Sequence, residues 1–514
     1  MTERNQINID ELGYTYRYYR DLCPSYLRFA TLIGGYRFDL KPISYLELGF
    51  GQGVSINMHA AACEGVFWGN DYNPAQVAYA QGLASASGAP VTLVQDSFEQ
   101  LARRDDLPAF NIIGLHGIWT WISESDRAHI VELVRRRLAP GGLLYVSHNS
   151  LTGWAKMLPL RKLMFAHAQM TGSPDEALTA KVRKAIEFVQ SLHDAGAKHA
   201  RTNPGAVAQL QGLRPRSDTY LAHEFFSHNW QPTSFLDVAA QFGDAGLSFA
   251  GTTYLMDTVP GFSIQEPAQR LLESVPDPTL REAAREYLMD ATFRKDVFVR
   301  DGERLSERDQ EEALLNEHFV LTAMVDDVPM QASSSAGAVN LDARHFRPIL
   351  EALASNGYSP KSLRDLRNAG LFRGQSVRDA ASAMIALLSG PLVFVAAYPE
   401  RSEAQLAHCH ALNQRICELR AHGDSEVMDL ASPVVGGGVP VGNDEQLFML
   451  AHFQGAADPE AYAKFAWTCV EPQRRSVRGD MSANDAQAAI NDLTARARAF
   501  ALRRLPILKA IGVV

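Results

Sequence analysis

Short apolar runs alternate with amphipathic stretches along residues 43–150. A short apolar run between turn-forming residues predicts a buried strand, and apolar positions repeating every three to four residues predict a helix. Strict alternation of the two predicts a parallel sheet with helices on both faces, an α/β fold. The pattern gives strands at 43–49, 66–71, 91–96, 110–117 and 143–149, and helices at 54–65, 75–87, 98–104 and 125–139.

Helix boundaries in this region carry clear signals. Asn73 is a good N-cap, and Pro74 fits the first turn of the helix that follows. Ser123 would cap the helix over 125–139, and the Pro-Gly-Gly sequence at 140–142 would end it. These signals support the alternating pattern independently of hydrophobicity.

Beyond residue 150 the pattern changes. Residues 151–215 are helical and amphipathic, and they lie where a cap over an active site could be inserted. The region 216–305 returns to the α/β pattern, with a helix over 232–246 and strands at 247–255 and 293–300. We expect these last two strands to complete the sheet at its edge, so that the catalytic unit comprises a core over 1–150, the insertion and the region 216–305.

A charged stretch near residue 305 marks the next boundary. The C-terminal region, 306–514, mixes helices with short strands and predicts an α+β region, with a winged helix as a candidate for 312–400 and a further subdomain over 401–514. The sequence SSSAGA at 333–338 predicts a turn. The glycines of GGGVP at 436–440 predict a bend rather than a phosphate loop, because no strand-turn-helix context surrounds them.

The bulk composition narrows the class of protein. With 514 residues, 46% hydrophobic and 21% charged, the chain is expected to form about three globular domains. The net charge of −9 argues against nonspecific nucleic-acid binding, which needs a basic face. The polar N-terminus is not a signal peptide, and no apolar run is long enough to span a bilayer. Five scattered cysteines indicate a reducing, cytoplasmic setting without disulfides.

One group of residues could suggest a metal site. His408, Cys409 and His410 are consecutive, and Cys417 follows two helical turns later. Adjacent side chains on a helix point in different directions and cannot share one ion easily. We therefore expect no metal.

The first strand ends in an acid followed by three glycines at alternate positions, in the sequence ELGFGQG. In open α/β sheets ligands bind at the carboxyl ends of the strands, and Gly49, Gly51 and Gly53 would let a ligand approach the backbone there. The spacing differs from the G-x-G-x-x-G that holds a pyrophosphate. Glu47 would repel phosphate and attract an ammonium group. The loop therefore predicts a ligand with a cationic amine and no phosphate.

The ends of the next two strands complete the ligand. Asp71 ends the second strand, where an acid can accept hydrogen bonds from a ribose diol. Asp96 and Ser97 end the third strand, where a carboxylate can accept from an adenine amino group, and Phe98 can line the ring pocket. Amine, ribose and adenine without phosphate describe S-adenosylmethionine.

Residues 43–150 resemble the class I S-adenosylmethionine-dependent methyltransferases, and ELGFGQG resembles their first motif. This resemblance implies a Rossmann-like seven-stranded sheet and methyltransferase activity. The segments YTYRYYRDLCP at 14–24, WGNDYNPAQ at 68–76, 220–251, FRKDVFVR at 293–300 and LASPVVGGGVPVGNDEQLFMLA at 430–451 are similar to bacterial methyltransferases that carry a methyltransferase regulatory domain. The best-known similar group methylates lysines of rickettsial outer-membrane proteins.

The acceptor side of the site would lie at the ends of the fourth and fifth strands. His148 is a candidate to accept the proton of an amine nucleophile, with Asn149 beside it, although the resembling family often has an aromatic residue where His148 stands. Trp119 and Trp121 could wall a channel for an alkyl amine. His116 is expected to lie against the cofactor.

Two further groups could reach the site from elsewhere in the chain. His223 and Glu224 lie beyond the predicted insertion, and they could equally pair with each other. Tyr14, Tyr16 and Tyr18 form an N-terminal aromatic cluster, of which one residue, Tyr16 in our assignment, could fold over the cofactor.

Three functions remain open from sequence. The first is methylation of a protein side chain, most simply the lysine amine, because long accessory regions suit a large substrate; it would need an open acidic groove. The second is methylation of a small molecule under the helical cap, which would need a closed pocket of a few hundred Å3. The third is a cofactor-binding scaffold, which the intact glycine loop disfavours. A protein partner fits the acidic chain better than nucleic acid, and a homodimer is compatible with it.

Overall fold

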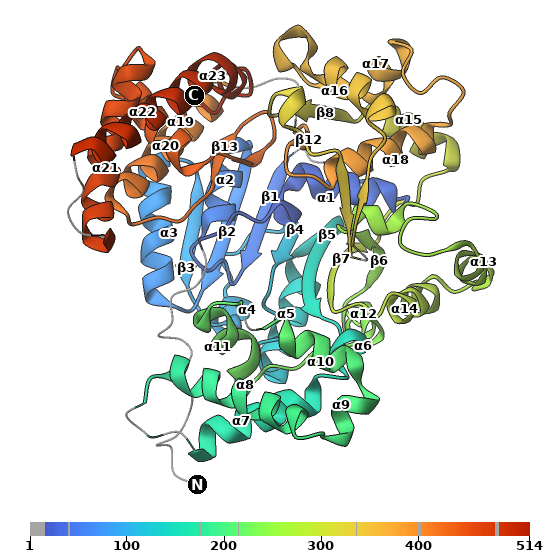
Figure 1. Ribbon diagram of the computed structural model, residues 1–514. Helices are drawn as coiled ribbons and strands as arrows, with labels where there is room; N and C mark the ends of the chain where they lie inside the picture. The colour runs from blue at the N-terminus through green and yellow to red at the C-terminus, as the bar shows by residue number, and fades with distance from the viewer. Residues whose placement is uncertain are drawn as a thin grey trace.

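The centre of the computed structural model is a seven-stranded sheet in the order β3-β2-β1-β4-β5-β7-β6 (Figure 1). The structure describes residues 16–39, 42–171, 173, 176–213, 215–335, 337–397, 402–478 and 483–514. All strands run parallel except β7, which pairs antiparallel with both β5 and β6. The strands are β1 (Ile43–Leu48), β2 (Gly65–Asp71), β3 (Val91–Gln95), β4 (Phe110–Leu115), β5 (Leu138–Asn149), β6 (Leu247–Thr252) and β7 (Phe293–Arg300).

Helices cover both faces of this sheet, as the alternating pattern predicts. Buried side chains of β1, β4 and β5 alternate between two cores, so that Tyr45 and Tyr145 belong to one core, and Leu46 and Leu144 belong to the other. The first face is covered by η2 (Arg20–Leu22), α1 (Pro24–Ile33), α2 (Val54–Ala62) and α3 (Pro74–Ser87). The second face is covered by α4 (Phe98–Arg103), α5 (Glu124–Arg137) and α12 (Phe235–Gly243).

Capping residues stabilise the starts of the helices, and Asn73 was predicted as one of them. The Asn73 side chain accepts hydrogen bonds from the backbone of Ala75 and Gln76, which satisfies otherwise unpaired N–H groups at the start of α3. Ser97 and Gln100 form a capping box at the start of α4. The two edge strands predicted at 247–255 and 293–300 are confirmed as β6 and β7.

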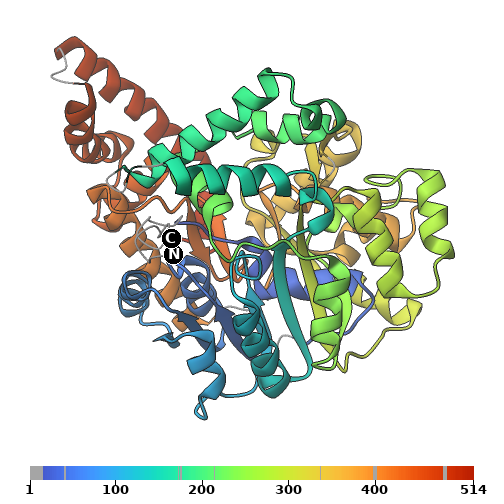
Figure 2. The ribbon, with the colours of Figure 1, turned by 90° about the horizontal axis from the view of Figure 1, so that it is seen from below.

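The insertion between β5 and α12 is a helical layer with its own small core. Its helices are α6 (Leu151–Trp154), α7 (Leu158–Thr171), α8 (Leu178–Asp194), α9 (Lys198–Thr202), α10 (Pro204–Gln211) and α11 (Asp218–Phe226). The core includes Trp154 and Trp230, whose rings are 4.9 Å apart, and residues of α11 also pack into it. This helical insertion, residues 151–226, lies beyond the carboxyl ends of the parallel strands (Figures 1 and 2).

Between β6 and β7 the chain forms η3 (Leu255–Thr258), α13 (Glu266–Ser274) and α14 (Pro278–Leu288). Glu286 of α14 is buried. Its carboxylate accepts hydrogen bonds from the Ser150 hydroxyl and the backbone N–H of Phe235. This contact ties the helical pair to the start of the insertion and to α12.

Residues 306–397 form a mixed layer against α1. Its elements are α15 (Glu307–Leu315), β8 (His318–Leu321), η4 (Val325–Asp327), the hairpin of β9 (Gln331–Ser334) and β10 (Gly337–Asn340), α16 (Ala343–Tyr358), β11 (Lys361–Ser362), α17 (Leu363–Asn368), α18 (Val377–Leu388) and β12 (Val393–Val395). The helices and strands from α16 to β12 follow the order of the winged helix considered for this region. The middle strand of its sheet is β8, however, which precedes the helices. The connectivity therefore departs from a winged helix, in which a hairpin after the last helix supplies that strand.

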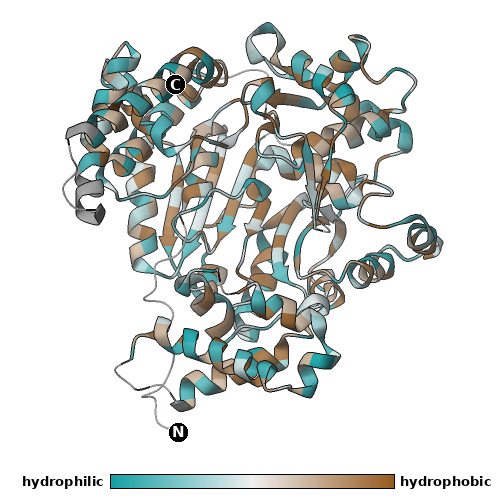
Figure 3. Ribbon diagram, in the orientation of Figure 1, coloured by the Kyte–Doolittle hydropathy of each residue, from teal (hydrophilic) through white to brown (hydrophobic). Residues whose placement is uncertain are grey.

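The last region packs directly onto α2 and α3. It comprises α19 (Glu403–His422), β13 (Asp429–Ser432), β14 (Gly437–Pro440), α20 (Asn443–Phe453), α21 (Pro459–Arg478), α22 (Ala483–Ala499), the π-helical turn η5 (Phe500–Arg504) and α23 (Leu505–Ala510). Its buried residues join those of the sheet in one continuous core. Apolar positions accordingly concentrate between the elements, and polar ones on the outer helix faces (Figure 3).

The glycines at 436–438 correct one expectation. They do not form only a bend, because Gly437 and Gly438 begin β14. A Cβ added at Gly437 would lie 2.1 Å from the hydroxyl oxygen of Tyr18, and one at Gly438 would lie 2.8 Å from the ring. The glycines therefore make room for an N-terminal aromatic side chain. Within the described part of the chain, no helix is both long and apolar enough to cross a membrane.

Candidate active site

The glycine loop between β1 and α2 needs glycine at each alternate position. Gly49, Gly51 and Gly53 have φ angles of 63°, 59° and 66°, in the left-handed region that other residues rarely adopt. A Cβ at Gly49 would lie 2.5 Å from Ile118, and one at Gly53 would lie 2.4 Å from the Cβ of Ala80. The backbone is therefore bare at the carboxyl end of β1, as the sequence predicts.

Glu47 lies buried beside this loop and is 4% exposed. The Tyr45 hydroxyl donates a hydrogen bond to its carboxylate at 3.2 Å. Burial raises the pKa of Glu47 to about 8, although the bond from Tyr45 opposes that shift. A cationic group brought next to Glu47 would relieve the cost of burying its charge.

Asp71 fixes the glycine loop from the neighbouring strand. Its carboxylate accepts hydrogen bonds from the backbone N–H groups of Gly51 and Asn73, each at 2.9 Å. Burial raises the pKa of this carboxyl, and the two backbone bonds oppose the shift. The Asn70 side chain donates to the backbone oxygen of Asp96 at 3.0 Å, which joins the ends of β2 and β3. The acids predicted to hold ribose and adenine thus share one edge of the sheet.

At the end of β3 the predicted adenine contacts already have structural partners. Asp96 pairs with Arg104 at 3.0 Å, and Ser97 caps α4. Phe98 is half-buried and packs against the core on the second face of the sheet. The backbone at Asp96 and Ser97 and the ring of Phe98 line the same strand end.

His116 follows β4 and stands in an aromatic enclosure. Its Nδ1 is 2.8 Å from the Tyr145 hydroxyl, and its ring lies 4.1 Å from that of Tyr19 and 6.2 Å from that of Phe293. Burial lowers the pKa of His116 to about 4, so the ring is neutral at pH 7. Sequence reasoning found His116 but missed Tyr19 and Tyr145, which come from the N-terminal segment and from β5.

The N-terminal segment crosses this end of the sheet, but Tyr16 does not stack on His116. The Tyr16 ring packs edge-on against Tyr79 of α3 at 5.1 Å. Tyr19 takes the place beside His116, and its backbone N–H donates to the Ser55 hydroxyl at 2.9 Å. Tyr14 lies outside the described residues. The aromatic cluster is thus divided between two places along the cofactor edge.

A second charged group lies next to His116 and was not foreseen. Lys295 of β7 pairs with Asp21 at 2.7 Å, and its ammonium lies 4.6 Å from the centre of the Tyr254 ring. The Thr253 hydroxyl donates to Asp21 at 2.8 Å. Burial opposes ionisation of Asp21, but Lys295 and His116 lower its pKa overall. The segments DLCP and FRKDVFVR contain the two residues, but they lie so far apart in the sequence that their pairing could not be predicted.

His148 is not placed to accept a proton from a substrate. It is fully buried, on the face of the sheet opposite to Tyr145, because side chains alternate along β5. Its Nδ1 lies 3.1 Å from the Thr233 hydroxyl, and its Nε2 lies 3.4 Å from Asp296. Asp296 is in turn held by Arg294 through two bonds of 2.8 and 2.9 Å. The proposed base is therefore part of a structural network.

Asn149 points the other way and meets the insertion. Its side-chain amide donates to Glu224 of α11 at 2.9 Å. Glu224 is 9% exposed, and burial raises its pKa to about 7, with Asn149 and Arg161 opposing the shift. Glu224 was a candidate from sequence and lies beside Asn149. The side chain of His223 lies outside the described residues.

The two tryptophans separate. Trp119 is fully buried and packs 5.0 Å from the Phe242 ring on the second face of the sheet, so it cannot wall an open channel. Trp121 is half-buried and packs against the core of the helical insertion. Of the two, only Trp121 therefore stays a candidate for the wall of a channel.

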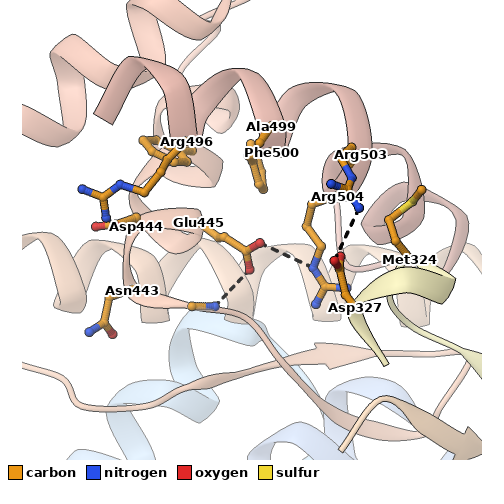
Figure 4. Close-up of a pocket in the computed structure, with 12 residues that line it drawn as sticks. Met324, Asp327, Asn443, Asp444, Glu445, Arg496, Ala499, Phe500, Arg503 and Arg504 are labelled. Atoms are coloured by element: carbon orange, nitrogen blue, oxygen red, sulfur yellow. Dashed lines mark hydrogen bonds and ion pairs between the residues drawn. The ribbon is translucent and has the colours of Figure 1, made fainter. Parts of the chain in front are cut away.

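Two other features lie away from the glycine loop. A cavity of about 560 Å3 is lined by η5, the start of α20 and residues of η4, and its arginines Arg503 and Arg504 face Asp327 and Glu445 (Figure 4).

In the group His408 to Cys417, Cys409 is buried and donates to the backbone of Ala61. Among the described residues no group of three or more potential ligands could hold a metal ion.

The residues at the strand ends fit S-adenosylmethionine. The buried carboxyl of Glu47 suits an amine, one oxygen of Asp71 accepts from the backbone of Gly51 in the glycine loop, and Gly49 and Gly53 leave no room for a Cβ. Asn70 also has a buried side-chain oxygen without a hydrogen-bond partner among the described residues. Together with the strand order, these features define a class I methyltransferase site.

Comparison with known proteins agrees with this assignment. Residues 46–142 match the family described as "Methyltransferase domain", and residues 217–300 match the "Predicted methyltransferase regulatory domain". The "Uncharacterized protein sll1526" of Synechocystis sp. is 30% identical over 514 residues, which is 99% of each chain. The chain belongs to the family of S-adenosylmethionine-dependent methyltransferases that carry a methyltransferase regulatory domain.

A solved structure shares the whole fold. PKMT2 from Rickettsia typhi, in complex with AdoHcy, superposes with a TM-score of 0.68 at 16% identity, over 97% of this chain and 99% of that one. The "Uncharacterized protein RP028" of Rickettsia prowazekii is 24% identical over 225 residues, which is 43% of this chain and 88% of that protein. The shared fold thus extends through the insertion and the C-terminal region.

Proposed function

We propose that this methyltransferase transfers methyl groups to lysine side chains of a protein. The observation that carries the proposal is the pair of Asn149 and Glu224 at the end of β5. The Glu224 carboxyl has a pKa raised to about 7 and lies on the insertion side of the sheet. An amine acceptor must arrive neutral, and a carboxylate that titrates near pH 7 can accept its proton and release it again.

The cofactor supplies an electrophilic methyl group on a sulfonium, so the chain mostly positions the two reactants and removes water from around them. Glu47 would hold the amine, and Asp71 the ribose. The remaining cofactor contacts that we propose are Gly49, Gly51, Gly53, Asp96, Ser97, Phe98, His116 and Tyr16. His116 is neutral at pH 7, so it adds no positive charge beside the sulfonium.

The acceptor side is formed by residues from distant parts of the chain. The rings of Tyr19, Tyr145 and Phe293 surround His116, and aromatic faces attract alkyl ammonium groups. Trp121 packs against the core of the insertion. Asn149 would orient Glu224, and Glu224 would take the proton.

A protein substrate is supported by the extent of the fold. The correspondence with PKMT2, a protein-lysine methyltransferase, covers the insertion and the C-terminal region, not only the cofactor domain. Methylation of a small molecule remains the alternative function. The cavity in Figure 4 gives it no support, because its lining residues belong to the C-terminal region and not to the strand ends.

The test is transfer of radiolabel from S-adenosylmethionine to a lysate of the host cells. We expect label in one or a few protein bands, acid-stable and recovered as methyl-lysine after hydrolysis. The Asp71→Ala variant, which loses the ribose carboxylate, should give no label. Label confined to the small-molecule fraction, or recovered on a residue other than lysine, would refute the proposal.

A further inference from the structure

The Glu224 carboxyl lies where the helical insertion meets the end of the sheet. It belongs to α11 and accepts a hydrogen bond from Asn149, the last residue of β5, at 2.9 Å. The side chain is buried, and a buried carboxyl without compensation can hold its proton to about pH 8–9. A proton acceptor at this place therefore needs a neighbouring group that stabilises its charged form.

Arg161 of α7 is held near Glu224 by contacts within the insertion. Its guanidinium lies over the Trp230 ring, 4.3 Å from the ring centre, and its Nη2 donates to the backbone oxygen of Ser227 at 2.5 Å. Trp230 in turn packs 4.9 Å from Trp154 in the core of the insertion. A planar guanidinium stacks well on an indole ring and keeps its charge there. Arg161 is thus a charge that is fixed in one place.

Arg161 acts on Glu224 through its charge and not through a hydrogen bond. Burial raises the pKa of Glu224 to about 7, and the bond from Asn149 and the charge of Arg161 limit that rise. Burial lowers the pKa of Arg161 to about 10, so the guanidinium stays charged at pH 7. A directly hydrogen-bonded guanidinium would keep the carboxylate ionised far below pH 7 and make it a poor base. The longer-range attraction leaves Glu224 able to take up a proton and to release it.

The other groups around Glu224 do not supply this charge. Burial and the charge of Glu224 raise the pKa of Tyr220, on the same helix, so its hydroxyl is neutral at pH 7. Asn149 donates a hydrogen bond but carries no charge, and the side chain of His223 lies outside the described residues. Among the described groups that shift the pKa of Glu224, Arg161 is the one that carries a charge.

We propose that Arg161 is a positioning residue for methyl transfer: held on the Trp230 ring, its charge allows Glu224 to lose its proton at neutral pH. The inference rests on the proposed function, in which Glu224 accepts a proton from the lysine ammonium. In that step one N–H bond of the ammonium breaks, its electron pair stays on nitrogen, and the proton passes to a carboxylate oxygen. A Glu224 that already holds a proton at pH 7 could not take part.

The test is an infrared pH titration of the full chain. The Glu224 signal is the protonated-carboxyl band that the native chain shows and the Glu224→Gln variant lacks. We expect this band to disappear around pH 7 in the native chain and about one pH unit higher in Arg161→Gln. Arg161→Lys keeps the positive charge, so its band should move by less than half as much. This measurement needs no substrate.

The matched control is Lys162→Gln, which removes a positive charge from the next, exposed position of α7 and should leave the band in place. Arg161→Met is a second variant without the charge, because its unbranched apolar side chain can still pack on the Trp230 ring. It should titrate as Arg161→Gln does. An unmoved band in either charge-free variant, or an equal displacement in Arg161→Lys or Lys162→Gln, would overturn the inference.

Labelling of the host lysate gives a second measurement. The pH of half-maximal protein labelling should also rise by about one pH unit in Arg161→Gln, with S-adenosylmethionine affinity unchanged. Weaker labelling at an unchanged half-maximal pH would mean that Arg161 binds substrate or only supports the insertion, and the inference would fail. If the infrared band moves as expected but the native chain labels no protein lysine, the proposed function fails and the effect of Arg161 on Glu224 stands.

Discussion

At the scale of single residues, the sequence allows a role to be predicted where that role depends on neighbours along the chain. The glycine loop, Glu47 and Asp71 were chosen as candidates because each lies at or directly after the end of a strand. His148 was misassigned as a base, although the period of two along β5 already places it on the same face as Leu144 and opposite to Tyr145 and Asn149. To assign a role to a strand residue, one must know on which face of the sheet its side chain lies, and not only its position along the strand.

Replacing Gly53 by Ala should abolish cofactor binding. The new Cβ would lie 2.4 Å from the Cβ of Ala80, at a φ of 66° that costs an L-residue about 1 kcal/mol even without the contact. We expect S-adenosylmethionine affinity to fall by a factor of at least about 100, measured by calorimetry. Gly82→Ala is the control, because a Cβ there meets nothing within 4 Å.

Glu47 should make stability fall as pH rises. Its folded pKa is about 8, far above the ordinary value for Glu, so between about pH 5 and 8 the folded state holds a proton that the unfolded state has released. Stability without cofactor is then greatest below pH 5 and declines by at most about 1.4 kcal/mol per pH unit up to pH 8. Denaturant unfolding of Glu47→Gln should lack this decline, and an identical pH profile in both proteins would contradict the assignment.

Glu224→Gln should lower kcat about 100-fold without weakening cofactor binding. With the carboxylate present, the rate should rise as pH increases through about 7, where Glu224 loses its proton. The variant should lose this limb of the profile. Glu187→Gln, at an exposed position of α8, is the matched control. A retained limb at pH 7 would exclude Glu224 as the proton acceptor.

At the scale of elements, strand and helix positions were largely predictable, but their partners were not. Residues 293–300 were expected as a strand and form β7, because an apolar run between turn signals is a local property. The glycines of β14 were interpreted as a bend, because nothing nearby in sequence shows that Tyr18 needs their space. The continuation of the insertion through α11 depends on a core shared with distant helices.

The contact between β14 and the N-terminal segment gives a prediction. Gly437→Ala would place a Cβ 2.1 Å from the Tyr18 hydroxyl and 3.3 Å from the Cys23 sulfur. Overpacking of this kind costs about 1–3 kcal/mol, and it should displace the segment that carries Tyr19. We expect a lower Tm and weaker S-adenosylmethionine binding. Gly442→Ala, where a Cβ meets only the Glu445 side chain at 3.8 Å, should change neither.

At the scale of the whole molecule, the sheet and the C-terminal region form one core. Met58 and Ala61 of α2 share it with Leu412 and Ile416 of α19 and with Val439 of β14. Sequence analysis placed a domain boundary between these parts, because composition and charge change along the chain. It could not show that the two share buried surface, since that depends on tertiary packing.

Deleting residues 402–514 should therefore prevent stable folding of the remainder. Removal would expose the faces of α2 and α3 that α19 covers, including buried Cys63 and Ala61. We expect the fragment to bind a hydrophobic dye and to melt without a cooperative transition. Adding residues 402–514 as a separate chain should restore S-adenosylmethionine binding, and a fragment that melts cooperatively alone would contradict the shared core.

The Tyr18 ring lies between β14 and α2, where its hydroxyl is 3.4 Å from Nε2 of His59. His59 in turn lies 5.5 Å from the ring of Tyr45, which donates to Glu47. Any molecule that shifts the hairpin of β13 and β14 on binding would therefore change the energy of Glu47, the carboxylate that we propose to bind the amine. By thermodynamic linkage, S-adenosylmethionine would then change the affinity of the chain for that molecule by the same factor. Binding at the hairpin would therefore depend on whether the cofactor is bound.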